Sequence, residues 1–201
     1  MKAIIIIPLI IIFSLNGYAQ TYKAHFEKAT SKFKRGNVKG SIKELNKAVE
    51  INPSDPTAYF NRAESKVKLN IFKEAVDDFS KAIELDSNRS IAYNDCGAAM
   101  LYLKDYTGSI WYFNRAINLD SMCALAFDNR GYAEFNLHNY SDAMPDYDKA
   151  ISINPNDADA YFNRGILKSA LNDITGSIKD YDQALKIKPG NAKVYNNRGR
   201  S

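Results

Sequence analysis

The sequence predicts an all-α protein, a solenoid in which one helix–turn–helix unit is repeated along the chain. Three observations predict this fold. A short segment recurs at a constant spacing, small and aromatic residues recur on two helical stripes inside each spacing, and turn-forming residues separate the stripes. The 201 residues are 45% hydrophobic and 25% charged, which is the ordinary composition of a globular domain or a repeat array.

The recurring segment contains an aromatic residue, Asn or Asp, then Arg and a small residue. Its copies are YFNRA at 59–63, FDNRG at 127–131, YFNRG at 161–165 and YNNRG at 195–199, and YNDCG at 93–97 is an altered copy. Aligned on this segment, the repeats occupy residues 22–55, 56–89, 90–123, 124–157 and 158–191, and a partial sixth repeat occupies 192–201. Positions below are numbered from the first residue of each repeat.

Each repeat is expected to form two helices. Positions 4, 8 and 11 fall on one helical stripe, and positions 20, 24 and 27 fall on another. Positions 8, 20 and 27 hold only Ala, Gly or Ser, and position 24 holds Leu, Phe or Tyr, which indicates two helices in close contact. Asn, Asp or Gly at positions 15 and 16 supply the turn between them. Asp55 and Pro56 form an N-cap followed by Pro at the first helical position.

The period, the helix pair and the residue types resemble the tetratricopeptide repeat family, whose pattern is W-x2-L-G-x2-Y, A-x3-F and P in a repeat of about 34 residues. In the fifth repeat the matching residues are Tyr161, Gly165, Ser177, Tyr181 and Pro189. The resemblance implies a right-handed α-solenoid whose first helices line a concave groove. Two positions depart from the family. Its Leu at position 7 is here Lys, Arg or Cys, and its Tyr at position 11 is Lys, Met or Glu.

The departure at position 7 is matched by a change at position 23. An acid stands at position 23 wherever a base stands at position 7, and where position 7 is Cys96 position 23 is Tyr112. This covariation inside a repeat predicts ion pairs between its two helices, because Arg can bury its stem and fork onto a carboxylate. The predicted structural pairs are Lys28 with Glu44, Arg62 with Asp78, Arg130 with Asp146, and Arg164 with Asp180.

Position 6 is the candidate for function. An Asn side chain has both donors and an acceptor, so a row of Asn can hold the backbone of an extended peptide without reading its sequence. The resemblance places these Asn in the groove, beside aromatic residues. The alternative is that the Asn only solvate the groove or were copied by duplication. The predicted partner-binding residues are Asn61, Asn129, Asn163, Asn197, Phe60, Tyr132, Phe135 and Phe162.

The segment Met1–Ala19 has the features of a signal peptide. Lys2 is a positive start, the apolar run from Ala3 to Phe13 is shorter than a membrane span needs, and Gly17 and Ala19 are small. Cleavage is expected between Ala19 and Gln20, followed by export to a periplasmic or secreted location. No stable membrane span is expected after cleavage. The alternative is an uncleaved anchor.

The chain has no residue pattern typical of an enzyme. We expect no catalytic residues, no cofactor and no metal, because two His and two Cys have no metal-ligand spacing and no nucleophile set or phosphate-binding loop stands out. The formal charge of +4 is spread along the chain without the basic stripe of a nucleic-acid-binding protein.

Two functions follow from the sequence. The first is an exported, non-enzymatic scaffold that binds extended peptide segments or a protein partner in its groove. The second is a structural component of an envelope complex that self-associates weakly through its unfinished C-terminal repeat.

Overall fold

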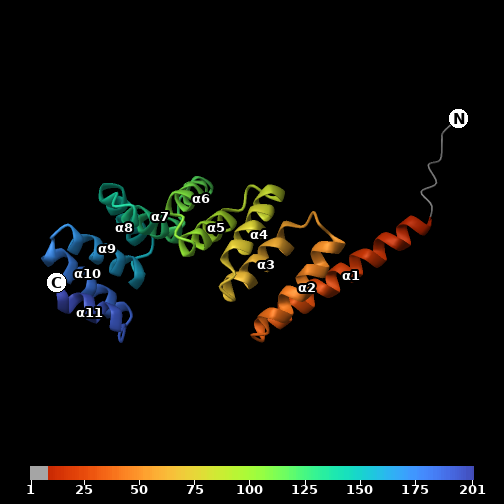
Figure 1. The fold of residues 1–201 in the computed structure, drawn as a ribbon, viewed down its shortest axis with the longest axis horizontal. Helices are drawn as coiled ribbons and strands as arrows, with labels where there is room; N and C mark the ends of the chain where they lie inside the picture. Colours follow the sequence, from red (N-terminus) through yellow and green to blue (C-terminus); the bar gives the residue numbers. More distant parts are fainter. Residues whose placement is uncertain (1–8) are drawn as a thin grey trace. The chain divides into compact units, whose positions relative to one another are not determined.

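The computed structural model describes residues 9–201, with side chains from residue 19 onwards. These residues form the predicted all-α fold, in which eleven helices follow one another along the chain (Figure 1). The helices are α1 Leu9–Lys34, α2 Val38–Ile51, α3 Pro56–Lys68, α4 Phe72–Leu85, α5 Ser90–Tyr102, α6 Tyr106–Leu119, α7 Ala124–Asn136, α8 Tyr140–Ile153, α9 Ala158–Ala170, α10 Ile174–Ile187 and α11 Ala192–Arg200.

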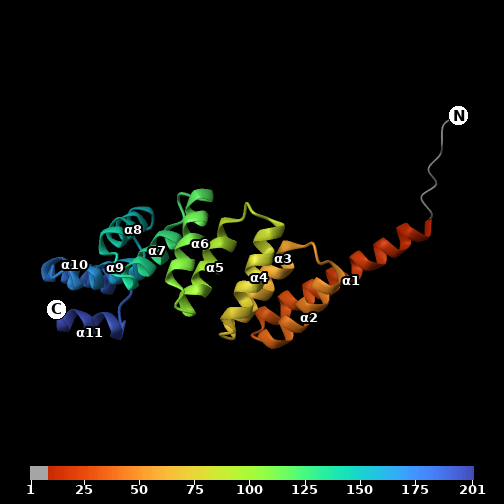
Figure 2. The same ribbon diagram turned by 45° about the horizontal axis from the view of Figure 1, so that its top comes forward.

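The helices divide into two compact units. The first unit ends at Ser87 and holds α1 to α4, and the second unit is Asn88–Ser201 and holds α5 to α11. Within each unit, consecutive helices pair as α1 with α2, α3 with α4, α5 with α6, α7 with α8, and α9 with α10 (Figure 2). The odd-numbered helices from α3 onwards begin at the residues at which the predicted repeats begin.

The turn inside each helix pair has one conformation throughout. The residue at position 15 has a positive φ of 59 to 78°, which belongs to the left-handed region favoured at the end of a helix. Gly and Asn suit this position, but His138 and Lys104 adopt it as well. The next residue caps the second helix in three repeats, where the side chain of Asn37, Asp105 or Asp173 accepts a hydrogen bond from a backbone N–H.

The core of each pair is built from the small and aromatic positions. Every residue at positions 8, 20, 24 and 27 of the five repeats is buried. At position 8 the packing leaves no room for more than a hydrogen in the fifth repeat, because a Cβ on Gly165 would lie 2.6 Å from the ring of Tyr181. The close approach predicted from the small residues therefore has a specific cause, the aromatic ring at position 24 of the facing helix.

The helix α11 packs against the last complete repeat. Val194 is 1% exposed and joins Tyr181, Ala184 and Leu185 in one apolar cluster, and the Asn191 side chain caps the helix by accepting from the N–H of Lys193. Tyr195 on the same helix is exposed. The partial sixth repeat therefore covers part of the apolar face of α10.

The predicted signal peptide lies at the start of the chain. Residues 1–8 lie outside the described residues, and α1 begins at Leu9 and continues through the expected cleavage position between Ala19 and Gln20. Over residues 9–201, no helix combines the length and the apolar character that a membrane crossing requires.

Candidate functional site

The constant spacing between position 7 and position 23 corresponds to contacts between the two helices of a repeat. Arg164 donates from Nε to Asp180 Oδ2 at 2.8 Å and from Nη2 to Asp180 Oδ1 at 2.7 Å. Arg62 with Asp78 and Arg130 with Asp146 have the same two-bond geometry. Each of these acids is buried. Such a fork on a buried carboxylate is a strong, directional pairing.

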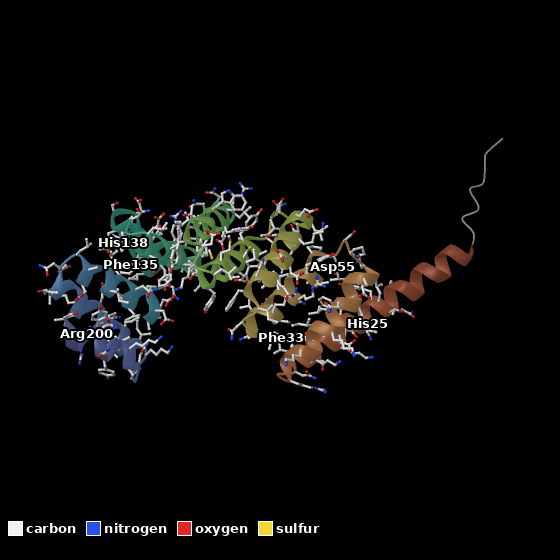
Figure 3. All side chains as sticks on the ribbon, in the orientation of Figure 1. His25, Phe33, Asp55, Phe135, His138 and Arg200 are labelled. Carbon is white, nitrogen blue, oxygen red and sulfur yellow. The ribbon has the colours of Figure 1, made fainter. Side chains whose placement is uncertain are left out.

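The fourth predicted pair, between Lys28 and Glu44, is wrong. Lys28 is exposed, and Glu44 Oε1 accepts instead from Lys32 Nζ at 2.7 Å, while Glu44 Oε2 lies 2.7 Å from His25 Nδ1. His25, which is labelled in Figure 3, stands at position 4 of α1. Lys32 stands at position 11 of the same helix, and both contact Glu44 on α2. Hydrogen bonds from Lys32 and His25 lower the pKa of Glu44 to about 2. A lysine stem at position 7 does not have the planar fork that Arg uses at that site.

The lysines at position 11 were not recognised as partners from the sequence. Lys66 Nζ lies 2.8 Å from Asp78 Oδ2, and Lys168 Nζ lies 2.8 Å from Asp180 Oδ2. Position 11 is one helical turn beyond position 7, so both bases reach the same acid. The sequence carried a signal for this contact, since the family's Tyr at position 11 is Lys in each repeat that has an acid at position 23, except the fourth.

Each arginine also joins neighbouring repeats, which the sequence analysis missed. The third donor of Arg164, Nη1, reaches Asp148 Oδ1 on α8 at 2.6 Å, and that of Arg130 reaches Asn114 Oδ1 on α6 at 2.5 Å. The guanidinium of Arg164 also lies over the ring of Tyr161, 5.6 Å from its centroid. In the repeats that have this Arg, the aromatic and the Arg of the recurring segment therefore form one packed unit that ties the repeat to the one before it.

The third repeat replaces this polar contact by aromatic packing. Cys96 is buried at position 7, and the ring of Tyr112 at position 23 lies 6.4 Å from that of Tyr93 and 4.8 Å from that of Trp111. The helix bounds relative to the repeat are the same as in the other repeats. The pair of helices is therefore compatible with either an ion pair or apolar side chains at these two positions.

Two of the predicted partner-binding aromatics are part of the core. Phe60 is 4% exposed and packs edge-on against Phe79, with 5.5 Å between ring centroids. Phe135 packs against the buried cluster around Tyr147 and lies 5.5 Å from the ring of Tyr140, at the end of α7 (Figure 3). Assigning Phe60 to a binding surface was wrong, because its ring is buried between helices of its own unit. Phe135 packs against the core but is only partly buried, and its part in binding stays a prediction.

Four other predicted residues line one cavity in the second unit. The cavity has a volume of about 810 Å³, in the range of ligand and peptide sites. It lies between α5, α7, α9, the segment 188–191 that joins α10 to α11, and the first residues of α11. The predicted residues that line it are Asn129, Tyr132, Phe162 and Asn163. The remaining two lie elsewhere. Asn61 lines a smaller cavity of about 150 Å³ in the first unit, and Asn197 donates to the carbonyl of Lys193 on its own helix.

The cavity asparagines are partly used within the protein. Asn163 Nδ2 donates to both oxygens of Asp128, at 3.1 and 3.2 Å, and Asn129 Nδ2 donates to Asn94 Oδ1 at 3.3 Å. Both contacts join one repeat to the previous one. An Asn side chain has a second N–H and an acceptor oxygen, so each keeps hydrogen-bonding capacity toward the cavity. The structure therefore adds a contact between repeats to the roles considered for these Asn, and their part in binding stays a prediction.

Asp128 also lines this cavity, although it was not among the predicted partner-binding residues. Its side chain lines the cavity although the residue is only 8% exposed. Burial raises the pKa of Asp128 to about 7, an effect opposed by the hydrogen bond from Asn163 and reinforced by Asp157 and Asp159. Among the residues that the structure describes, no group of three or more His, Cys, Asp and Glu is placed to hold a metal ion.

A model of the TPR repeat matches residues 31–70 and 131–170, and a model of the tetratricopeptide repeat matches 56–89 and 158–191. Together they cover more than half of the chain. No curated protein sequence matches.

Solved structures share the fold at low sequence identity. A crystal structure of MamA protein has a TM-score of 0.77 at 22% identity over 87% of this chain and 96% of that one. YrrB, described as a TPR protein with an unusual peptide-binding site, has a TM-score of 0.72 at 20% identity over 87% and 90%. The pilF protein of Pseudomonas aeruginosa has 0.76 at 21% identity over 89% and 81%.

These matches fit the geometry described above. A tetratricopeptide repeat scaffold has the same helix pairs, with small residues at positions 8, 20 and 27 and an aromatic at position 24. Its stacked units present a surface to protein partners. Scaffolds of this kind are generally not enzymes. This chain belongs to the tetratricopeptide repeat family.

Proposed function

We propose that the chain is an exported scaffold that binds an extended segment of a partner protein in the cavity of its second unit. The observation that carries this proposal is the lining of that cavity, where Asn129 and Asn163 stand beside Tyr132 and Phe162. Amide groups with spare donors and acceptors suit a peptide backbone, and aromatic side chains at the centre of a cavity suit its side chains. Export is supported by the residue pattern of the segment Met1–Ala19.

The spacing of the asparagines fits an extended segment. They project from α7 and α9, two first helices of adjacent repeats, and such neighbouring helices lie about 8–10 Å apart. An extended peptide advances about 3.3 Å per residue. One asparagine would therefore meet roughly every third residue of the segment, through its backbone.

The test compares partner capture by the purified chain and by the Asn129→Ala/Asn163→Ala variant, using envelope extract and mass spectrometry. We expect the variant to lose most of the captured protein. Because both Asn also bond to the previous repeat, a loss of about 1 kcal/mol per residue in the free energy of unfolding is expected as well. Capture is therefore measured per folded molecule.

The matched control is Asn136→Ala, on α7 but outside the cavity lining, where the side chain bonds only to the carbonyl of Tyr132 on its own helix. This variant should capture as well as the unchanged chain. Equal capture by the cavity variant and the control would contradict the proposal. Intact mass of the native protein tests export separately, since a start at Gln20 is expected and retention of Met1 would contradict it.

The second function, assembly through the C-terminal repeat, stays a prediction. Its weak self-association would show in sedimentation as a mass that rises with concentration. Burial of Val194 by α10 lessens the apolar face available for it.

A further inference from the structure

The inference starts from the surroundings of Asp128. A buried carboxylate is costly unless a cation or several hydrogen bonds compensate its charge. The bonds made to Asp128 come from one neutral group, the amide of Asn163. The nearest charges that act on it, Asp157 and Asp159 at the start of α9, are acids and disfavour its ionisation further. The carboxylate thus lines the cavity with its charge uncompensated.

The cations near the cavity do not satisfy this charge. Lys188 and Lys193 line the cavity from the segment before α11 and from α11 itself, and both are exposed. Among the ion pairs of residues 9–201, none involves Asp128 or Asp159. The exposed lysines can extend into solvent, whereas the buried aspartate is fixed.

The walls next to Asp128 suit the stem of a long basic side chain. Leu101 and Tyr102 contribute from α5, Tyr132 from α7 and Phe162 from α9. Apolar and aromatic walls accommodate the methylene stem of Arg or Lys, and an aromatic face also attracts the cationic head. This combination, an acid among aromatic side chains, is complementary to a cationic side chain and poorly suited to an anionic one.

We propose that the cavity selects partner segments carrying Arg or Lys, and that the cationic group of that side chain pairs with Asp128. The inference rests on the proposed function, because it names the residue type that a bound segment would place in the cavity. Arg fits best, since its planar guanidinium can stack on Tyr132 or Phe162 while it bonds to the carboxylate.

Binding of a cation should depend on pH in a defined direction. The ionised form of Asp128 binds the cation, and its pKa in the free protein is about 7. Affinity should therefore rise by about tenfold between pH 6 and pH 8, as the ionised fraction rises from about one tenth to nine tenths. The other titratable groups near it are Asp157 and Asp159 on α9, Tyr147 on α8, Tyr102 and Tyr132 on the walls, and Lys188 and Lys193 at the opening.

The experiment selects random peptides from a display library against the purified chain and against two variants. The first is Asp128→Asn, which keeps an acceptor for Asn163. The second is the matched control Asp142→Asn, an exposed acid in the first turn of α8 that does not line the cavity. We expect Arg or Lys to be enriched at one peptide position by the unchanged chain and by the control, and not by Asp128→Asn. The best peptide should bind Asp128→Asn at least tenfold more weakly, without a pH dependence.

The outcomes separate this inference from the function on which it rests. Peptides selected without enrichment of Arg or Lys, or with an enrichment that survives in Asp128→Asn, would overturn the role of Asp128 and leave the peptide-binding cavity in place. Failure of the unchanged chain to select any peptide would overturn both. Thermal unfolding of each variant, followed by circular dichroism, establishes that the compared proteins are folded.

Discussion

Two buried aspartates of the second unit have opposite surroundings. Asp180 is 4% exposed and lies between α9 and α10, where Arg164 and Lys168 both reach it within 2.8 Å. Asp128 is 8% exposed and lies on the cavity, where it accepts from the neutral amide of Asn163 and has Asp157 and Asp159 nearby. Both residues are buried, yet only one has its counter-ions within the chain.

The difference separates structural acids from a candidate binding acid. A carboxylate that holds two helices together must have its cations nearby, because an unpaired buried charge destabilises the fold. Asp180 meets this requirement and Asp128 does not, which is why burial moves the pKa of Asp128 to about 7. An uncompensated acid in a cavity fits a site whose cation arrives with a partner.

The third repeat shows that the helix pair itself does not require the ionic contact. Cys96 and Tyr112 stand where Arg164 and Asp180 stand two repeats later, and the Tyr112 ring contacts those of Tyr93 and Trp111. Replacement of a buried ion pair by apolar side chains of similar volume is often neutral for stability, whereas removal of one partner is not. The same helix pair therefore forms with an ion pair or with apolar and aromatic side chains at positions 7 and 23.

The largest effect is expected from Asp180→Ala. The change leaves Arg164 and Lys168, both mostly buried, without their shared acceptor, so the free energy of unfolding should fall by about 3–4 kcal/mol. Urea unfolding at neutral pH measures this loss. The control is Asp182→Ala, whose exposed carboxylate pairs with Arg198 and should cost at most about 1 kcal/mol. A double-mutant cycle of Arg164→Ala and Asp180→Ala that shows no coupling would contradict the pairing between helices as a source of stability.

The next effect, of opposite sign and dependent on pH, is expected from Asp128→Asn. The pKa of Asp128 is higher in the folded state than in the unfolded chain, so the folded state holds the proton more tightly between about pH 4 and pH 7. Ionisation of Asp128 therefore lowers the free energy of unfolding of the unchanged protein as the pH rises across that range. Asn does not titrate, and the advantage of the variant should grow from pH 4 to pH 8 by at most about 4 kcal/mol, since each unit between the folded and unfolded pKa is worth about 1.4 kcal/mol.

Urea unfolding at a series of pH values measures this advantage as the difference between the variant and the unchanged chain. Asp142→Asn, an exposed acid on α8, gives the reference for a charge change outside the cavity. A difference between Asp128→Asn and the unchanged chain that does not vary with pH would show that Asp128 stays ionised in the folded protein.

The fold could be predicted from the sequence because each repeat presents the same pattern again. Five copies of Ala at position 27 indicate a buried helix contact more firmly than any single copy could. The pairing of Arg130 with Asp146 followed from covariation inside the repeat. The covariation failed for Lys28, because His25 and Lys32 on the same face of α1 occupy the carboxylate of Glu44.

The cavity could be predicted only in part. Asn129, Asn163, Tyr132 and Phe162 line it, but no periodic pattern separates them from Phe60, which the packing buries, or from Phe135, which packs against the cluster around Tyr147. The side chains of the adjacent repeats decide whether a residue at a given position lines a cavity or packs against a ring. These neighbouring side chains differ from one repeat to the next. Asp128 stands at position 5 of its repeat, where Phe60 and Phe162 stand in other repeats. This change from an aromatic residue to an acid was the signal in the sequence for a role of Asp128.

The smallest effect is expected from Asp148→Asn, which tests whether burial or distance decides the value of an ion pair. Arg164 reaches Asp148 at 2.6 Å and Asp180 at 2.7 Å, but the side chain of Asp148 is 55% exposed and that of Asp180 is 6% exposed. Asn already accepts from the corresponding arginine in two other repeats, at Asn46 and Asn114. The variant should therefore lose less than about 1 kcal/mol in low salt.

In about 1 M salt, where charges are screened within roughly 3 Å, this loss should disappear while the loss from Asp180→Ala largely remains. If both variants lost similar free energy of unfolding and salt affected neither loss, the short distance alone would set the contribution of an ion pair to stability. Burial would then not explain the contrast between Asp180 and Asp128.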